Sequence, residues 1–126
     1  MTEARHNLLI VDDEYASLEV LALLMSREGF QVFTATDGEE ALLELARVPM
    51  ALVITDYKMP RMDGSELCRR MLADPRFSQI PVIFTSATYR QDVPRHENVV
   101  AFFNKPLFFK DVLASVRRIL PGAPPR

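Results

Sequence analysis

Acidic side chains follow two of the apolar runs in this sequence, directly where each run ends. Asp12 and Asp13 come after the run 8–11, and Asp56 comes after the run 51–55. If these runs are neighbouring strands, the three carboxylates repel one another and raise one another's pKa values unless a cation lies between them. An oxygen-only site with few protein ligands suits magnesium, which keeps several of its waters. The three aspartates are therefore candidate ligands for Mg²⁺ (or Mn²⁺).

Each of these residues also has a purely structural interpretation. Asp12 and Asp13 could be a helix N-cap and a first-turn acid that faces the helix dipole. Asp56 alone could form the turn that follows a strand. Ser86 and Lys105 stand near the ends of two further apolar runs, and singly they would be a loop hydroxyl and a solvated amine. The occurrence of all these groups at equivalent strand ends favours one shared functional site.

The same residue types could take part in phosphoryl transfer. A carboxylate can attack phosphorus as a nucleophile and form an aspartyl phosphate. The transfer then needs mainly in-line positioning and cations around the equatorial oxygens. Mg²⁺ on Asp13 and Asp56 would supply one cation and Lys105 a second, while the Ser86 hydroxyl would donate a hydrogen bond to a third oxygen. This set predicts a metal-dependent aspartate that accepts a phosphoryl group.

The elements that must position these residues alternate between strand and helix patterns. Continuous apolar runs of about five residues suit strands that are buried on both faces of a parallel sheet. The runs cover 8–11, 32–35, 51–55, 82–85 and 99–103. Helical patterns lie between most of them, with Gly29 as one C-cap and a capping box that opens at Asp37. The sequence therefore predicts an α/β fold, with a doubly wound five-stranded parallel sheet and helices on both faces.

The segment between the last two runs departs from this pattern. Pro94 stands in its middle and pushes Val93 away from helical geometry. Residues 90–98 also give no amphipathic stripe that could hold a helix on the sheet. Helix four is therefore expected to be missing or a single turn, with Pro94 as its first residue and 95–98 to complete it. We expect residues 88–98 to be the most mobile part of the unphosphorylated domain.

Composition bounds the class of protein. A chain of 126 residues with 48% hydrophobic and 25% charged residues fits one globular domain, expected over 1–120 with a Pro-rich tail over 121–126. A net charge of −2 disfavours sequence-independent binding to nucleic acid or to an anionic membrane. The single cysteine, Cys68, excludes an internal disulfide and is expected to fill apolar space inside a helix. We expect a cytoplasmic protein, with His96 exposed to solvent.

Four segments carry a resemblance to a known family: LLIVDDE at 8–14, VITDYKMPRMDG at 53–64, VIFTSA at 82–87 and FFNKPL at 102–107. Together they resemble the receiver domains of two-component response regulators. Each segment alone is a weak signal, but their order and spacing are specific, and the resemblance extends over about residues 7–120. It implies the flavodoxin-like strand order 2-1-3-4-5.

The resemblance implies a role for each acidic residue. Asp56 matches the aspartate that is phosphorylated in the family. Asp13 matches the residue that binds Mg²⁺ directly, and Asp12 matches the acid that holds a water of the metal. The backbone carbonyl of Lys58 would supply a further metal ligand.

The resemblance also implies roles around the phosphoryl group. Ser86 matches the hydroxyl residue that moves toward this group, and Lys105 matches the lysine that pairs with it. Phe102 falls where the family keeps an aromatic side chain that changes rotamer on activation, although a place in the strand core is an equal alternative. Lys58 and Thr88 are expected to tune the lifetime of the phosphorylated state.

The function that the resemblance implies is that of a phosphoacceptor receiver domain in phosphorelay signal transduction. A sensor histidine kinase or a phosphotransfer protein would phosphorylate Asp56, and the domain would then control an effector protein or an output domain outside this sequence. It would be no enzyme beyond assisting its own phosphotransfer and autodephosphorylation. We expect a monomer before phosphorylation, no direct nucleic-acid binding and no membrane association.

Two alternatives remain open from the residues. One is a phosphorylation-independent adaptor with a receiver fold. The other is a phosphohydrolase of the haloacid-dehalogenase type, which also uses an aspartyl nucleophile. Such enzymes usually keep an acid/base aspartate two residues after the nucleophile, and this sequence has Lys58 there.

Overall fold

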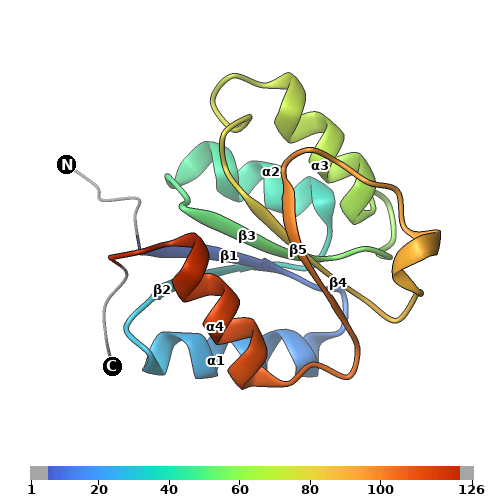
Figure 1. Cartoon of the computed structure of the whole chain (residues 1–126). Helices are drawn as coiled ribbons and strands as arrows, with labels where there is room; N and C mark the ends of the chain where they lie inside the picture. Colours follow the sequence, from blue (N-terminus) through green and yellow to red (C-terminus); the bar gives the residue numbers. More distant parts are fainter. Residues whose placement is uncertain (1–5, 123–126) are drawn as a thin grey trace.

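The computed structural model describes residues 6–122, which form a five-stranded parallel sheet between two layers of helices (Figure 1). The strands are β1 (Asn7–Val11), β2 (Gln31–Ala35), β3 (Leu52–Asp56), β4 (Val82–Ser86) and β5 (Val99–Asn104). Their order is β2-β1-β3-β4-β5, and every neighbouring pair is parallel. The predicted fold class and the strand order that the resemblance implied are both confirmed.

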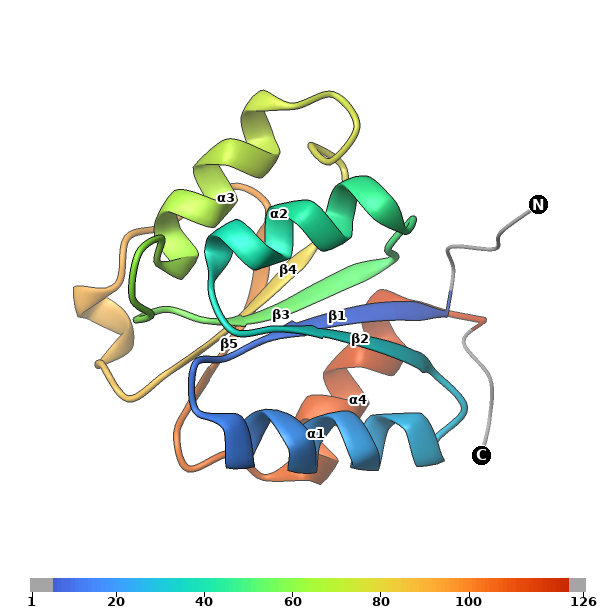
Figure 2. The ribbon, with the colours of Figure 1, turned by 180° about the vertical axis from the view of Figure 1, so that it is seen from behind.

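Four α-helices cover the sheet, and in the described part of the chain none is long and apolar enough to cross a membrane. They are α1 (Tyr15–Arg27), α2 (Gly38–Arg47), α3 (Gly64–Ala73) and α4 (Phe109–Ile119). Helices α1 and α4 lie on one face of the sheet, and α2 and α3 lie on the other (Figures 1 and 2). The proposed boundary between a domain and a tail falls just after α4, and residues 123–126 of that tail lie outside the described residues.

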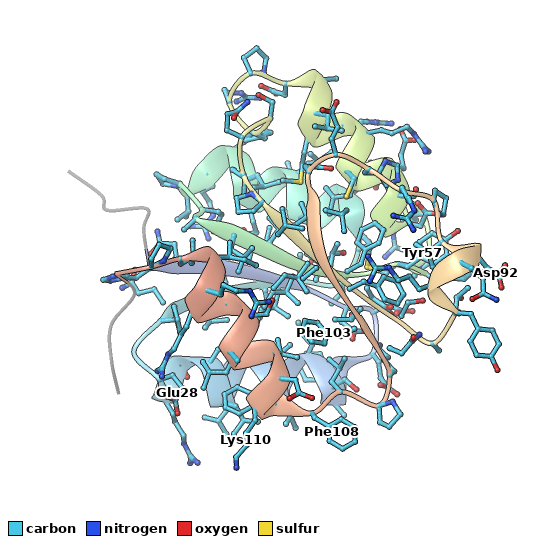
Figure 3. All side chains as sticks on the ribbon, viewed as in Figure 1. Glu28, Tyr57, Asp92, Phe103, Phe108 and Lys110 are labelled. Atoms are coloured by element: carbon cyan, nitrogen blue, oxygen red, sulfur yellow. The ribbon has the colours of Figure 1, made fainter. Side chains whose placement is uncertain are left out.

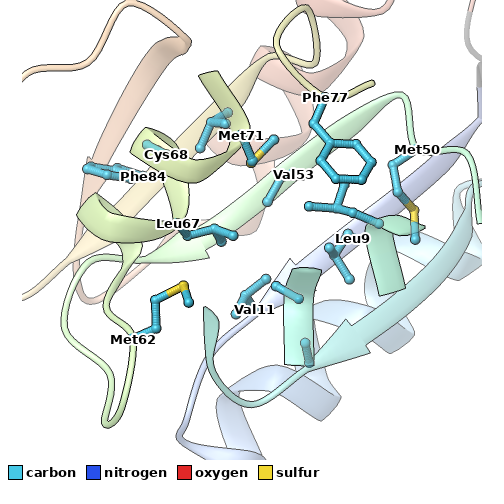
Figure 4. Packing of buried hydrophobic residues seen from close by; sticks show 14 of the residues in the cluster. Leu9, Val11, Met50, Val53, Met62, Leu67, Cys68, Met71, Phe77 and Phe84 are labelled. Carbon is cyan, nitrogen blue, oxygen red and sulfur yellow. The ribbon is translucent and has the colours of Figure 1, made fainter. Parts of the chain in front are cut away.

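Side chains of the central strands alternate between the two faces and form two apolar clusters. In β1, Leu9 and Val11 face α2 and α3, whereas Leu8 and Ile10 face α1 and α4. Burial on both faces explains why this run is continuously apolar. Figure 4 shows the first cluster, in which the Cys68 side chain of α3 is buried. Burial raises the pKa of its thiol to about 12, so Cys68 is an inert apolar part of the core.

The sequence predicted five strands that are buried on both faces, but the outer strands β2 and β5 are partly exposed. In β2, Gln31 and Thr34 are exposed. In β5 the pairing with β4 skips Val100, because Val82 pairs with Val99 and the next residue of β4 pairs with Ala101. An extra residue of this kind forms a bulge, which is common at sheet edges. The bulge turns Val100 outward. At the edges of the sheet, a continuous apolar run therefore predicts more burial than the strand has.

Between β4 and β5 the chain makes one 3₁₀ turn, Arg90–Asp92, in place of a full helix. The sequence predicted that the helix between β4 and β5, the fourth in chain order, is missing or a single turn, and this is confirmed. The predicted place of that turn, 95–98 after Pro94, is wrong. Val93 is extended, with φ −104° and ψ 128°, as the residue before Pro94 should be. The turn therefore closes before the proline, and a second turn at 97–98 leads into β5. The mobility of residues 88–98 stays a prediction.

His96 lies half-buried, so the prediction that it is exposed is wrong. Its Nε2 is hydrogen-bonded with Ser65 Oγ at the start of α3, and its ring meets Phe84 edge-on with 6.1 Å between centroids. The segment between the 3₁₀ turn and β5 brings the ring onto α3 and β4. Burial lowers the pKa of His96, the charge of Arg69 lowers it further, and Asp63 opposes this shift.

Because the fold disfavours the charged imidazolium of His96, the free energy of unfolding should fall as the pH drops below the unfolded-state pKa of about 6.5. His96→Gln removes this titration. Its stability relative to wild type should therefore improve from about pH 7.5 to about pH 5.5, as measured by urea unfolding. His6→Gln, at the other end of the sheet, is the control. A stability difference that does not change with pH would contradict the assignment.

Candidate functional site

The predicted site residues gather at the edge of the sheet where the parallel strands end. Asp12 directly follows β1, Asp56 is the last residue of β3, Ser86 is the last residue of β4, and Lys105 directly follows β5. In a parallel sheet the carboxyl ends of all strands meet at one edge, and the helices that follow begin there. The topology alone therefore places an amine and a hydroxyl on the same edge as the carboxylates.

The three aspartates form a compact cluster of oxygens. One carboxylate oxygen each from Asp12, Asp13 and Asp56 lies within 4.8 Å of the other two. Asp12 and Asp56 are only 7% and 8% exposed, whereas Asp13 faces solvent. One cation could contact an oxygen of each, and such a set of hard oxygen donors with one open side suits Mg²⁺ with retained waters.

The backbone orients the two buried carboxylates. Asp12 Oδ1 accepts a hydrogen bond from the Glu14 amide at 2.9 Å, and Asp56 Oδ1 accepts one from the Tyr57 amide at 2.9 Å. The N-cap of α1 is Glu14, whose side chain makes no capping hydrogen bond. The alternative in which Asp12 and Asp13 cap this helix is therefore wrong.

Lys105 lies between the two buried carboxylates. Its Nζ donates to Asp12 Oδ2 at 3.0 Å and to Asp56 Oδ2 at 3.2 Å. The backbone holds the lysine here, because its amide donates to the Ser86 carbonyl at 2.8 Å. An amine that reaches two acids from two strands matches the cation that the sequence predicted, and it brings Lys105 directly to Asp56.

Burial and charge perturb the pKa values in this cluster. Burial raises the pKa of Asp56, the Lys105 ammonium opposes this shift, and the neighbouring charge of Asp12 adds to it. Burial lowers the pKa of Lys105, but its hydrogen bond to Asp12 and the charges of both aspartates outweigh burial, so the pKa of Lys105 is raised. The lysine therefore stays an ammonium, and negative charge on Asp56 is disfavoured in the absence of a further cation.

Ser86 and its neighbours form a hydrogen-bonded corner at the ends of β4 and β5. Ser86 is buried, and its Oγ accepts from the Thr88 amide at 2.8 Å. Asn104 Nδ2 donates to the carbonyls of Ser86 at 3.1 Å and of Thr88 at 2.8 Å. Asn104 is a site-forming residue that the sequence analysis missed. The available signal was its place next to Lys105 at the end of a strand.

Two further predicted residues lie around this corner. Phe102 is half-buried in β5 against the cluster under α2 and α3, and the Arg90 guanidinium lies 5.7 Å from its ring centroid. Both the strand-core and the switch interpretation of Phe102 remain compatible with this position. Lys58 is exposed in the loop between β3 and α3, next to the labelled Tyr57 (Figure 3).

An apolar hollow of about 650 Å³ adjoins the cluster between α1 and the connection from β5 to α4. Its walls include Leu21, Leu24 and Leu107, and it reaches Asp12 and Lys105. On the same side of the molecule, Phe108 projects from the start of α4 (Figure 3) and is 69% exposed. The carboxylates are therefore flanked on this side by exposed apolar surface.

The sequence matches the family model of the response regulator receiver domain over residues 8–117. It is 31% identical over 117 residues to the sensory transduction protein RegX3 of Mycobacterium bovis, an alignment that covers 90% of this chain and 50% of RegX3. The chain thus spans about half the length of that curated relative.

Solved structures show the same likeness. The signal receiver domain of a signal transduction histidine kinase from Syntrophus aciditrophicus has a TM-score of 0.81 and 31% identity, with 93% of this chain and 91% of that chain covered. The response regulator TrrA from Thermotoga maritima, solved in complex with Mg(2+)-BeF, has a TM-score of 0.80 and 28% identity, with 90% and 98% covered. The fold, the carboxylate edge and these matches agree, and the chain belongs to the response regulator receiver domain family of two-component signalling.

Proposed function

We propose that this chain accepts a phosphoryl group on Asp56 from a histidine kinase or a phosphotransfer protein, in a reaction that depends on Mg²⁺. The observation that carries the proposal is the position of the Asp56 carboxylate, between two other aspartates and the Lys105 ammonium. A carboxylate in such surroundings combines a nucleophilic oxygen with nearby positive charge. Phosphorylation then changes the conformation of the domain and thereby controls a partner.

Three side chains act directly on the phosphoryl group. A carboxylate oxygen of Asp56 forms a bond to phosphorus as the bond from phosphorus to the donor breaks, and no base is needed because Asp56 attacks as the anion. Lys105, which already contacts Asp56, neutralises charge on one phosphoryl oxygen. The Ser86 hydroxyl donates to another after leaving the Thr88 amide, to which it is bound in this structure.

The metal would be held by carboxylate oxygens of Asp13 and Asp56 and by the Lys58 carbonyl, with Asp12 holding a water of the metal. When bound, Mg²⁺ (or Mn²⁺) supplies positive charge that offsets the repulsion among the carboxylates and stabilises the transferring phosphoryl group. The support is the oxygen-only donor set, with ligand atoms within 4.8 Å of one another. TrrA, at 28% identity, has been solved with Mg(2+)-BeF.

We propose that Ser86 and Phe102 transmit the change. Movement of the Ser86 side chain toward Asp56 opens space at the end of β4, and Phe102, on the neighbouring strand, can then change rotamer. In this structure Phe102 is partly covered by Arg90 of the 3₁₀ turn. The turn therefore takes the place of helix four as the segment that senses this side chain.

Lys58 and Thr88 should set the lifetime of the aspartyl phosphate. Both lie two positions after a residue of the proposed site, and by family geometry their side chains flank the path of the attacking water. Lys58→Ala and Thr88→Ala should each change the rate of dephosphorylation, measured from the loss of the phosphorylated species by intact mass. Lys110→Ala, an exposed lysine of α4, is the control. Identical decay rates in all four proteins would refute the assignment.

The partners follow from this role. We propose that the donor contacts the hollow beside α1 and that the output is a separate effector or a domain outside this sequence, since RegX3 is about twice as long. The domain acts in the cytoplasm, is a stoichiometric acceptor rather than an enzyme, and binds neither nucleic acid nor membrane. We propose a monomer before phosphorylation, because the face formed by β5 and α4 lacks the helix that was considered between β4 and β5.

The test is incubation with acetyl phosphate and Mg²⁺ followed by intact mass. The expected result is a gain of about 80 Da, the mass of one HPO₃. No gain is expected when EDTA is present from the start, because the transfer needs the metal. No gain would favour the phosphorylation-independent adaptor. Multiple turnover of an aryl phosphate would instead favour the phosphohydrolase.

A further inference from the structure

The loop between β3 and α3, residues 57–63, is tied by a side chain to the start of α2. The Arg61 guanidinium donates from Nε to Asp37 Oδ2 at 2.7 Å, and its Nη2 donates to the same oxygen. This loop contains Lys58, whose carbonyl is proposed to bind the metal. A contact between residues 24 positions apart thus connects the proposed metal site to a helix that contributes no ligand.

Asp37 is built to receive this contact. Its side chain is only 6% exposed, and its Oδ1 caps α2 by accepting from the Glu40 amide at 2.8 Å. The hydrogen bond from Glu40 lowers the pKa of Asp37, burial opposes the shift, and Arg61 adds to it. The carboxylate is therefore charged at neutral pH, and Arg61 is the cation that pairs with it. A buried charge that loses its partner is costly, so the pair resists opening.

The backbone conformation at Arg61 disfavours arginine, so the reason for an arginine here is the contact of its side chain. Its φ is 66°, in the left-handed region that favours glycine. A glycine would adopt this conformation without strain, but it could not reach Asp37. The contact with Asp37 offsets the backbone cost and fixes the loop at this residue.

A second contact lies beside the first. The Gly38 amide donates to the Met62 carbonyl at 3.1 Å, and a Cβ on Gly38 would come within 2.9 Å of three Met62 side-chain atoms. The same connection touches the other side of the acidic cluster, because the Asp12 amide donates to the Ala35 carbonyl at 3.1 Å. Residues 35–38 therefore brace both the strand end that bears Asp12 and the loop that bears the Lys58 carbonyl.

We propose that Arg61 and Asp37 are positioning residues for the metal: their ion pair holds the 57–63 loop so that the Lys58 carbonyl faces the three aspartates, and it thereby sets the affinity for Mg²⁺. This inference rests on the proposed function. It predicts that the pair changes metal affinity without touching the metal, the phosphoryl group or Asp56.

The decisive variant is Arg61→Gly, because it removes the ion pair and the backbone strain together. The Kd for Mg²⁺, from titration of backbone amide chemical shifts, should rise about tenfold, as for other residues that orient metal ligands. The midpoint of thermal unfolding without metal should change little, because the loss of the ion pair and the relief of the backbone strain offset each other. Phosphorylation by acetyl phosphate should slow at low Mg²⁺ and recover at saturating Mg²⁺.

Three further proteins complete the test: a control, a second single variant and the double variant. Arg76→Gly removes a similarly exposed arginine that pairs with Asp74 away from the site, and it should leave the Kd for Mg²⁺ unchanged. Asp37→Asn keeps an oxygen to cap α2 but removes the charge, so it should weaken Mg²⁺ binding as Arg61→Gly does. The double variant should then lose little more than either single one, because both act through one contact.

The outcomes separate the two proposals. If wild type binds Mg²⁺ and takes up the phosphoryl group while Arg61→Gly and Asp37→Asn bind Mg²⁺ equally well, the positioning role is wrong and the proposed function stands. If the variants that bind Mg²⁺ more weakly also have a correspondingly lower midpoint of thermal unfolding without metal, the ion pair only stabilises the fold. The inference is then again wrong. If wild type itself neither binds Mg²⁺ nor is phosphorylated, the proposed function fails and this inference fails with it.

Discussion

Asp56→Asn should take up no phosphoryl group from acetyl phosphate under conditions in which the wild-type chain gains about 80 Da. The carboxamide has nearly the same size as the carboxylate, and its oxygen can still accept the Tyr57 amide that orients Asp56. What it lacks is the anionic nucleophile, so the acyl phosphate cannot form. The rate should fall below detection, a loss of more than about a thousandfold, as expected when a covalent nucleophile is removed.

Two control variants give this result its meaning. Asp111→Asn changes an exposed aspartate in the first turn of α4 and should be phosphorylated like wild type. Asp12→Ala should still be phosphorylated, but only at higher Mg²⁺, because it holds the metal through water in the proposed site. Uptake of one phosphoryl group by Asp56→Asn at the wild-type rate would show that the phosphoacceptor has been misplaced.

Gly64→Ala should destabilise the fold by about 3 kcal/mol or more, as overpacking against a fixed backbone does. A Cβ at this position would lie 2.4 Å from the backbone oxygen of Asp56 and 3.2 Å from the Cα of Tyr57. Those atoms belong to the end of a central strand, and the Gly64 amide is held to the Tyr57 carbonyl at 2.7 Å. Neither side of the clash can move without breaking the start of α3. Urea unfolding gives the free energy directly.

Gly38→Ala is the matched control for Gly64→Ala. Both glycines are the first residue of a helix, and a Cβ on Gly38 would also meet atoms closer than 3.0 Å. Those atoms are Cγ, Sδ and Cβ of the Met62 side chain. Rotation of the side chain can move Cγ and Sδ, and Cβ at 2.9 Å needs only a small shift, so the cost should be about 1–2 kcal/mol, below that of Gly64→Ala. If Gly64→Ala were no more destabilising than Gly38→Ala, the rigidity assigned to the strand end would be wrong.

The sequence was sufficient for the sheet because its central strands are buried on both faces. Apolar runs such as 51–55 carry that signal without needing knowledge of any long-range contact. The cluster at the strand ends could also be anticipated, since parallel strands bring their carboxyl ends together wherever they lie in the chain. Asp12, Asp56 and Lys105 are accordingly in contact as the residue types suggested.

What the sequence could not supply depends on contacts between distant residues. The bulge at Val100, the burial of His96 on Phe84 and the pairing of Arg61 with Asp37 each join segments that no local pattern connects. The position of the 3₁₀ turn was misjudged for a related reason. Pro94 is compatible with either end of a short turn, and only the path across α3 and β4 decides between them.

The length of the connection from β4 to β5 gives a physical reason for the missing helix. A strand of five residues is about 17 Å long, and the chain must run back over that distance to start the next parallel strand. On the way it must leave the plane of the sheet by a layer spacing of about 10 Å and return to it. Residues 87–98 supply twelve positions, about the minimum for a parallel crossover. Extended chain covers about 3.3 Å per residue and a helix only about 1.5 Å, so a full helix would leave too little chain for the return path.

This taut connection makes the domain unequally tolerant of changes in chain length. Added residues at the exposed 3₁₀ turn would cost only the slowly growing entropy of a longer loop, and they could restore a helix over β4 and β5. Removing two or three residues would force the 3₁₀ turn to straighten before the chain could join β4 to a parallel β5. We therefore expect the segment 87–98 to tolerate insertions better than deletions.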